Sequence, residues 1–152
     1  MSGDIEIVNT VAQPALSVRE RVKVADMSAA IGRMFGEVAG CMQRNNVQMA
    51  GPPFALYHSW SDQDVDMECG FPSAGPSSGE GNVKSLTLPA VKAAATVHVG
   101  PYGTIVETYT KVEKYVGEKG MELAPYMWEF YLNSPQEVPP EKLMTRIIWP
   151  IK

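Results

Sequence analysis

The residue with the clearest chemical potential is Glu129, the one carboxylate in the aromatic stretch YMWEFYLNSP at residues 126–135. The stretch is typical of a β-strand that ends at a turn. Alternation along such a strand puts Met127, Glu129 and Tyr131 on one face and Trp128 on the other. If the Glu129 face is buried, removing the carboxylate from water costs several kcal/mol unless a partner compensates it. A cationic aromatic guest would be such a partner.

An aromatic-lined carboxylate suits two kinds of site. It can bind a lipophilic cation, because Trp and Tyr faces add cation–π attraction and apolar burial adds about 25 cal/mol per Å². It can also act as a general acid or base, because burial raises the pKa of a carboxyl, while Tyr131, Tyr109 or Tyr102 hydrogen-bonds a substrate carbonyl. The remaining alternative is a solvent-exposed Glu129 paired with Arg146, which would contribute little stability.

Further candidate ligand contacts come from the first half of the chain. Trp60 ends a strand that matches residues 126–132 by pseudo-symmetry, so it either reaches the same site or lies at a rim or in the core. Met67 is one of nine methionines, whose flexible side chains suit surfaces that accept several shapes, although a single Met is more often a core residue. His98 precedes the second predicted helix, where fixing the turn is a commoner role than catalysis.

The composition is that of an ordinary globular chain of 152 residues, with 45% apolar and 20% charged residues, which suits one domain. Its net charge of −4 argues against direct nucleic-acid binding, which needs a concentrated positive field. We expect a cytoplasmic protein, because we find neither a secretory signal nor an apolar run long enough to span a membrane. Cys41 and Cys69 are expected to be free thiols. No zinc-like Cys and His spacing occurs, so no metal or organic cofactor is expected.

The first half of the chain predicts strands around one amphipathic helix. The apolar positions of the helix recur at steps of three and four residues, and Asp26 is a plausible N-cap. The predicted elements are an extended segment (4–22), the helix (26–46) and two short strands (54–60 and 65–71).

A Pro-, Gly- and Ser-rich loop (72–82) leads into a second half with the same order of elements. This half predicts an extended segment (83–99), a helix (104–120, with Gly120 just past its end) and closing strands (126–132 and 143–152). The halves align with Pro52 opposite Pro125 and Tyr57 opposite Phe130.

We therefore predict an α+β domain over residues 1–152, with an internal repeat of 1–75 and 82–152. Two pseudo-twofold-related β-α-β-β modules would form one antiparallel sheet with two helices on one face and a central cleft, because one module alone buries too little surface. Grooves of this kind commonly hold small ligands.

Two motifs resemble a known family. The segment VHVGPYGTIVETYTKVEKYV is similar to the His-x-Gly-x-Tyr motif that leads into the second helix of GyrI-like proteins, and WEFYLNSP is similar to their Glu-x-Tyr-Leu-x-x-Pro strand. This family includes the effector-binding domains of multidrug-sensing regulators of the MerR and AraC types. The resemblance implies two β-α-β-β modules around a cleft, in which the Glu matching Glu129 is buried among aromatics and meets lipophilic cations.

The predicted first strand begins at residue 5, which leaves no room for the DNA-binding segment of those regulators, so we expect a stand-alone member. The resemblance implies three functions for such a member. The first is a binding protein for lipophilic, often cationic, aromatic molecules, which we favour. The second is a hydrolase that opens cyclopropane-containing DNA-alkylating compounds, with Glu129 as acid or base and Tyr131 beside it. The third is a protein-interaction module, for example with gyrase, which the sequence does not single out.

Overall fold

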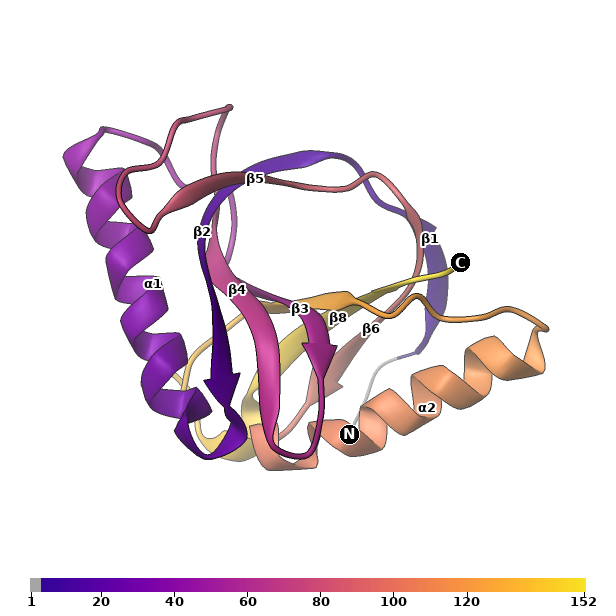
Figure 1. Cartoon of the computed structure of the whole chain (residues 1–152). Coiled ribbons are helices and arrows are strands. Elements are labelled where there is room, and N and C mark those ends of the chain that lie inside the picture. Colours follow the sequence, from indigo (N-terminus) through magenta and orange to yellow (C-terminus); the bar gives the residue numbers. More distant parts are fainter. Residues whose placement is uncertain (1–3) are drawn as a thin grey trace. The chain divides into compact units, whose positions relative to one another are not determined.

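The computed structural model describes residues 4–152, and the chain forms two compact units. The first unit is Val11–Ala90, and the second combines the chain up to Thr10 with Val91–Lys152. Within the described residues, each unit contains four strands and one long helix (Figure 1). The predicted α+β class is confirmed.

The first unit orders its strands β5-β2-β4-β3, all antiparallel, and packs helix α1 against β2 and β4. The ring of Phe35 on α1 lies 5.7 Å from that of Phe71 on β4. The face covered by α1 is therefore the one that carries Met67 and Tyr57, which are paired across β4 and β3. The elements are β2 (Gln13–Lys23), α1 (Met27–Arg44), β3 (Phe54–Trp60), β4 (Asp64–Pro72) and β5 (Lys84–Leu88).

The second unit orders its strands β1-β6-β8-β7, again antiparallel, and packs helix α2 against β6. Its elements are β1 (Glu6–Asn9), β6 (Lys92–Val99), α2 (Ile105–Glu118), β7 (Met127–Tyr131) and β8 (Met144–Pro150). Short 3₁₀ turns precede each helix and β8; they are η1 (Val24–Asp26), η2 (Tyr102–Thr104) and η3 (Pro140–Lys142).

Both helices end in the same backbone motif, which the sequence indicated only for α2. Gly120 follows α2 with a φ of 71°, and the Met121 N–H donates to Val116 O at 3.1 Å. Asn46 takes the equivalent place after α1 with a φ of 54°. Glycine and asparagine tolerate this left-handed conformation, which satisfies the last carbonyls of a helix. Asp26 occupies the N-cap position of α1, as predicted, but it is also the last residue of η1 and its side chain makes no capping hydrogen bond.

Each predicted extended segment is two strands, and the two strands belong to different units. Residues 4–22 contain β1, which pairs with β6, and β2, which pairs with β5. The second segment divides between β5 and β6 at Pro89, which has no N–H to offer a strand partner. Each unit therefore gains an edge strand from the other half of the sequence.

The structure disagrees with the sequence alignment of the two halves on which side chains of β3 and β7 share a face. Tyr57 lies on the face that α1 covers, and Glu129 contacts α2. Tyr57 therefore lies on the helix-covered face of its strand, as Glu129 does, whereas the sequence alignment paired Tyr57 with Phe130, which is on the opposite face of β7. A shift of one residue moves a side chain to the opposite face of a strand, and similarity between short apolar segments does not resolve such a shift.

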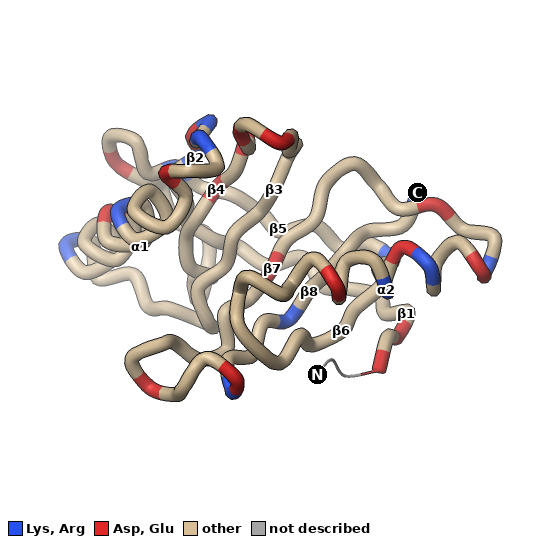
Figure 2. Tube along the Cα trace, turned by 90° about the horizontal axis from the view of Figure 1, so that it is seen from below, with Lys and Arg blue, Asp and Glu red and all other residues tan. Residues whose placement is uncertain are grey.

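Three further features concern the cysteines, the charged residues of the helices and the character of the helices. Cys41 and Cys69 are buried free thiols, as expected. Acidic and basic residues alternate along both helices (Figure 2). In the described residues, no helix combines the length and the apolar character needed to cross a membrane.

The close approach of β2 and β4 makes Gly70 a sensitive position. A Cβ atom at Gly70 would lie 1.9 Å from Leu16 O, so Gly70→Ala should lower the free energy of unfolding by more than about 2 kcal/mol. Gly36, on the exposed side of α1, has nothing within 4 Å of such a Cβ, and Gly36→Ala should be neutral or stabilising by up to about 1 kcal/mol. Urea unfolding of both variants measures the difference, and equal stabilities would contradict this packing.

Candidate functional site

Glu129 is a buried carboxyl in the middle of β7. Its residue is 2% exposed, and it lies opposite Ile147 of β8. Met127 and Trp128 on the same strand are also buried, which explains why so apolar a segment surrounds the acid.

Two tyrosine hydroxyls hold the carboxyl, one from a helix and one from its own strand. Tyr109 of α2 donates to Oε2, and Tyr131 donates to Oε1 at 3.2 Å. Tyr131 reaches the carboxyl because residues two apart on a strand share a face. Arg146 is opposite Phe130 and so lies on the other face. Among residues 4–152, no Lys, Arg or His forms an ion pair with Glu129.

Burial dominates the electrostatics of this carboxyl. It raises the pKa of Glu129 to about 7, and the hydrogen bonds from Tyr109 and Tyr131 oppose the rise. Burial penalises the ionised form, whereas hydroxyl donors stabilise it. The carboxyl is therefore poised to bind a cation when ionised and to donate a proton when protonated.

Tyr102 connects this buried group to the surface. It lies in η2 and is 41% exposed, and its ring meets that of Tyr131 edge-on at 5.9 Å. Burial, and then the negative charge of Glu129, raise the pKa of Tyr102. The contacts from Tyr102 through Tyr131 to Glu129 thus lead from an exposed ring to the carboxyl.

His98 bonds residues that are next in sequence to Tyr102 and Tyr109, namely Pro101 and Thr108. It is 3% exposed, and its Nε2 donates to Pro101 O at 3.1 Å while Nδ1 bonds Thr108 Oγ1 at 2.6 Å. Gly100 lies in the turn between His98 and Pro101 and has a φ of 135°, a conformation that favours glycine. His98 therefore fixes the start of α2, in agreement with the structural role favoured from sequence.

Aromatic packing adds Trp149 to the surroundings of Tyr109, whereas the predicted contact Trp128 lies on the other face of the strand. Trp149 contacts the Tyr109 ring edge-on at 6.1 Å and donates through Nε1 to Ala124 O at 2.9 Å. Trp128 is on the strand face opposite Glu129, where it stacks with Tyr126 at 6.4 Å and is 2% exposed. Met127 shares the face of Glu129.

The other two predicted ligand contacts belong to the first unit. Met67 is fully buried on the α1 face of β4, and Trp60 is 46% exposed at the end of β3. The roles of Trp60 and Met67, and the cleft that would bring them to Glu129, stay predictions.

Sequence reasoning missed a buried polar cluster in the first unit. Glu68 alternates along β4 with the apolar Met67 and Cys69, as a solvent-facing residue would, yet it is 8% exposed. It accepts a hydrogen bond from Ser17 Oγ at 2.6 Å and contacts His58 Nε2 at 2.5 Å. His58 lies at a register irregularity between Tyr57 and Ser59, and bulges of this kind redirect side chains. No periodicity in the sequence signals such a bulge.

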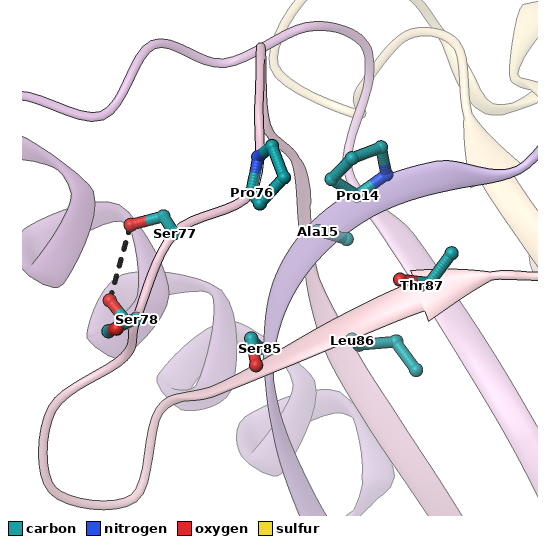
Figure 3. Close-up of a pocket in the computed structure, with 8 residues that line it drawn as sticks. All are labelled: Pro14, Ala15, Pro76, Ser77, Ser78, Ser85, Leu86 and Thr87. Carbon is teal, nitrogen blue, oxygen red and sulfur yellow. Dashed lines mark hydrogen bonds between the residues drawn. The ribbon is translucent and has the colours of Figure 1, made fainter.

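A pocket of about 410 Å³ lies at the edge strand of the first unit (Figure 3). It contains none of the predicted site residues and no acidic or basic side chain; its lining is Pro14, Ala15, Pro76, Ser77, Ser78, Ser85, Leu86 and Thr87. In the part of the chain that the structure describes, no three His, Cys, Asp or Glu side chains group as metal ligands.

Solved structures share this fold. A cryo-EM structure of an EcmrR–DNA complex matches with a TM-score of 0.87 at 21% identity, covering 98% of this chain and 57% of that chain. The crystal structure of the EcmrR C-terminal domain matches with a TM-score of 0.82 at 21% identity, covering 99% of this chain and 98% of that one. This chain therefore spans little more than half of EcmrR, in a region that corresponds to its C-terminal domain.

Two further structures with this fold are described by a ligand or an activity. SAV2435 bound to tetraphenylphosphonium matches with a TM-score of 0.66 at 13% identity, covering 98% of this chain and 94% of that one. A hydrolase from Listeria innocua matches with a TM-score of 0.71 at 15% identity, covering 97% of this chain and 91% of that one. Identities this low establish the fold alone.

Among curated proteins, none matches this sequence closely enough to count as a relative. The family model described as "GyrI-like small molecule binding domain" matches residues 3–152. This match, which includes both units and the strand that carries Glu129, shows that the chain belongs to the GyrI-like small-molecule-binding domain family.

Proposed function

We propose that this protein binds lipophilic aromatic small molecules, preferentially cations, at the site formed by Glu129, Tyr109, Tyr131 and Tyr102. The observation that carries the proposal is the burial of Glu129 without an ion-pair partner among residues 4–152. A buried carboxylate that lacks a positive partner is unfavourable. A guest cation supplies that partner, so part of the binding free energy comes from the carboxylate itself.

The aromatic surroundings suit the same class of guest. Edge-on contacts hold Tyr131 against Tyr102 and Tyr109 against Trp149. Aromatic faces attract a cation by about 0.5–2 kcal/mol each, and each Å² of apolar guest surface removed from water adds about 25 cal/mol. Such a lining recognises charge and size rather than one exact shape.

The comparison with SAV2435 supports this choice of ligand class, because that protein has the same fold and was solved with tetraphenylphosphonium. We further propose that the protein acts in the cytoplasm. We also propose that it does not bind nucleic acid directly, since its net charge is −4 and nucleic-acid surfaces need concentrated positive charge.

The second candidate is hydrolysis of electrophilic cyclopropane-containing compounds at the same site. The pKa of about 7 for Glu129 favours it, because general acids and bases work best near the ambient pH. In this mechanism Glu129 exchanges a proton with water or substrate, and Tyr131 stabilises developing charge on a carbonyl oxygen. A protein of the same fold described as a hydrolase gives this candidate its context.

Replacing the carboxyl by an amide tests the binding function. Glu129→Gln keeps an acceptor for a tyrosine hydroxyl but removes the charge, so affinity for cationic aromatic dyes should fall by about tenfold or more. Neutral aromatic dyes should bind with similar affinity to both proteins. Quenching of intrinsic Trp fluorescence measures both sets.

Glu118→Gln is the matched control, because Glu118 is an exposed carboxylate at the end of α2. It removes the same net charge without touching the buried carboxyl, so it should leave dye affinities unchanged. Equal losses in Glu129→Gln and Glu118→Gln would mean that only the overall charge matters, and would overturn the assignment of the site.

Turnover separates the two candidates. A cyclopropane-containing alkylating compound is incubated with catalytic amounts of protein, and the ring-opened product is counted by mass spectrometry. Hydrolysis predicts product well beyond one equivalent in the wild type and its loss in Glu129→Gln. Saturable binding of the compound without product would eliminate this candidate.

A further inference from the structure

We propose that Glu129 releases its own proton when it binds a monovalent cation. The site therefore changes the class of ligand that it prefers as the pH changes. It would take cationic aromatics at alkaline pH and neutral hydrogen-bond acceptors at acidic pH. This inference rests on the proposed function and adds its regulation.

The geometry provides the basis for this exchange. Both carboxyl oxygens accept tyrosine hydroxyls, and the described part of the chain places no positive group against them. The titratable neighbours are Tyr109 from α2, Tyr131 from β7 and Tyr102 from η2, and the residue opposite on β8 is the apolar Ile147. Phenols ordinarily ionise at about pH 10. The carboxyl is thus the group here whose charge changes near neutrality.

The two protonation states offer opposite chemistry to a guest. The ionised carboxylate offers negative charge and acceptor oxygens, which suit a cation. The protonated carboxyl has an O–H to donate, which suits a guest carbonyl or phosphoryl oxygen. The exchange balances, because the protonated carboxyl and a cation give the carboxylate–cation pair and one released proton.

The direction of the pH dependence follows from burial. Burial raises the pKa of Glu129 to about 7, so a cation must displace a proton at lower pH. Affinity for a cation should be constant well above this value and fall by about tenfold for each pH unit below it. Affinity for a neutral acceptor should change in the opposite direction, since that guest needs the proton.

Two probes of similar shape test the exchange. Tetraphenylphosphonium is a permanent cation, and triphenylphosphine oxide is a neutral acceptor that has three of the same phenyl groups. Each is titrated into the wild type between about pH 5 and about pH 8.5. Tetraphenylphosphonium should weaken by about tenfold or more at the acidic end, and triphenylphosphine oxide should tighten. Calorimetry in buffers of different ionisation enthalpy should show proton release with the cation only.

Two variants separate titration of Glu129 from acid damage to the protein. Glu129→Gln should give flat pH profiles with both probes. Tyr131→Phe removes a donor that favours the charged carboxyl, so the midpoint of the tetraphenylphosphonium profile should move to higher pH. Tyr115→Phe is the control, because Tyr115 stacks beneath Lys119 on α2, and its profile should match the wild type. A merely structural role for Tyr131 would change the affinity without moving the midpoint.

Thermal unfolding of the free proteins tests the titration without a ligand. A carboxyl whose pKa is raised on folding stabilises the fold at acidic pH, and this contribution is lost as the pH rises through the folded pKa. The melting temperature of the wild type should therefore fall relative to that of Glu129→Gln between about pH 5 and about pH 8.

The possible failures are distinguishable. If the wild type does not bind tetraphenylphosphonium at about pH 8.5, where the carboxylate is ionised, the proposed function is wrong. If it binds there and keeps the same affinity at about pH 5 without proton release, the proposed function stands and the proton exchange is overturned.

Discussion

The burial of one uncompensated carboxyl is the constraint on which the second unit depends. Glu129 is 2% exposed and is held by hydroxyls from α2 and from its own strand. Keeping it buried requires α2 to begin where Tyr109 reaches β7, and His98 fixes that start by bonding both the preceding turn and the helix. The hydrogen bonds from Tyr109 and Tyr131 thus hold an unfavourable buried group in a defined position. Such preorganisation lowers the free-energy cost of binding a ligand.

The two units share an order of elements but place their polar groups differently. The second unit has Glu129 and Ile147 as a cross-strand pair beneath its helix, and the first unit has Tyr57 and Met67 as a cross-strand pair on the face that α1 covers. In the first unit the buried acid is Glu68, on the face away from α1, and Ser17 and His58 are its partners. The two units therefore share a fold, but the first unit does not repeat the carboxyl and tyrosine arrangement of the second.

Membership of the GyrI-like family is consistent with this division between scaffold and site. The fold is shared at 13–21% identity with a tetraphenylphosphonium-bound protein and with a domain of a DNA-bound protein. A scaffold that tolerates so much sequence change gives little guidance to function by itself. The features that point to a function in this protein are a buried acid, the hydroxyls that hold it and the aromatic rings that lead to it.

The sequence by itself determined the helices, most strand positions, the α+β class and Glu129 as the residue to test. Helical periodicity, Gly120 and the aromatic strand carry those signals locally. Tertiary structure decided that β1 and β5 join opposite units, that Tyr57 rather than Leu56 lies on the helix-covered face, and that Glu68 is buried. These features depend on strand register and on contacts between distant segments. Short apolar strands specify such contacts weakly, because a shift of one residue reverses every side chain.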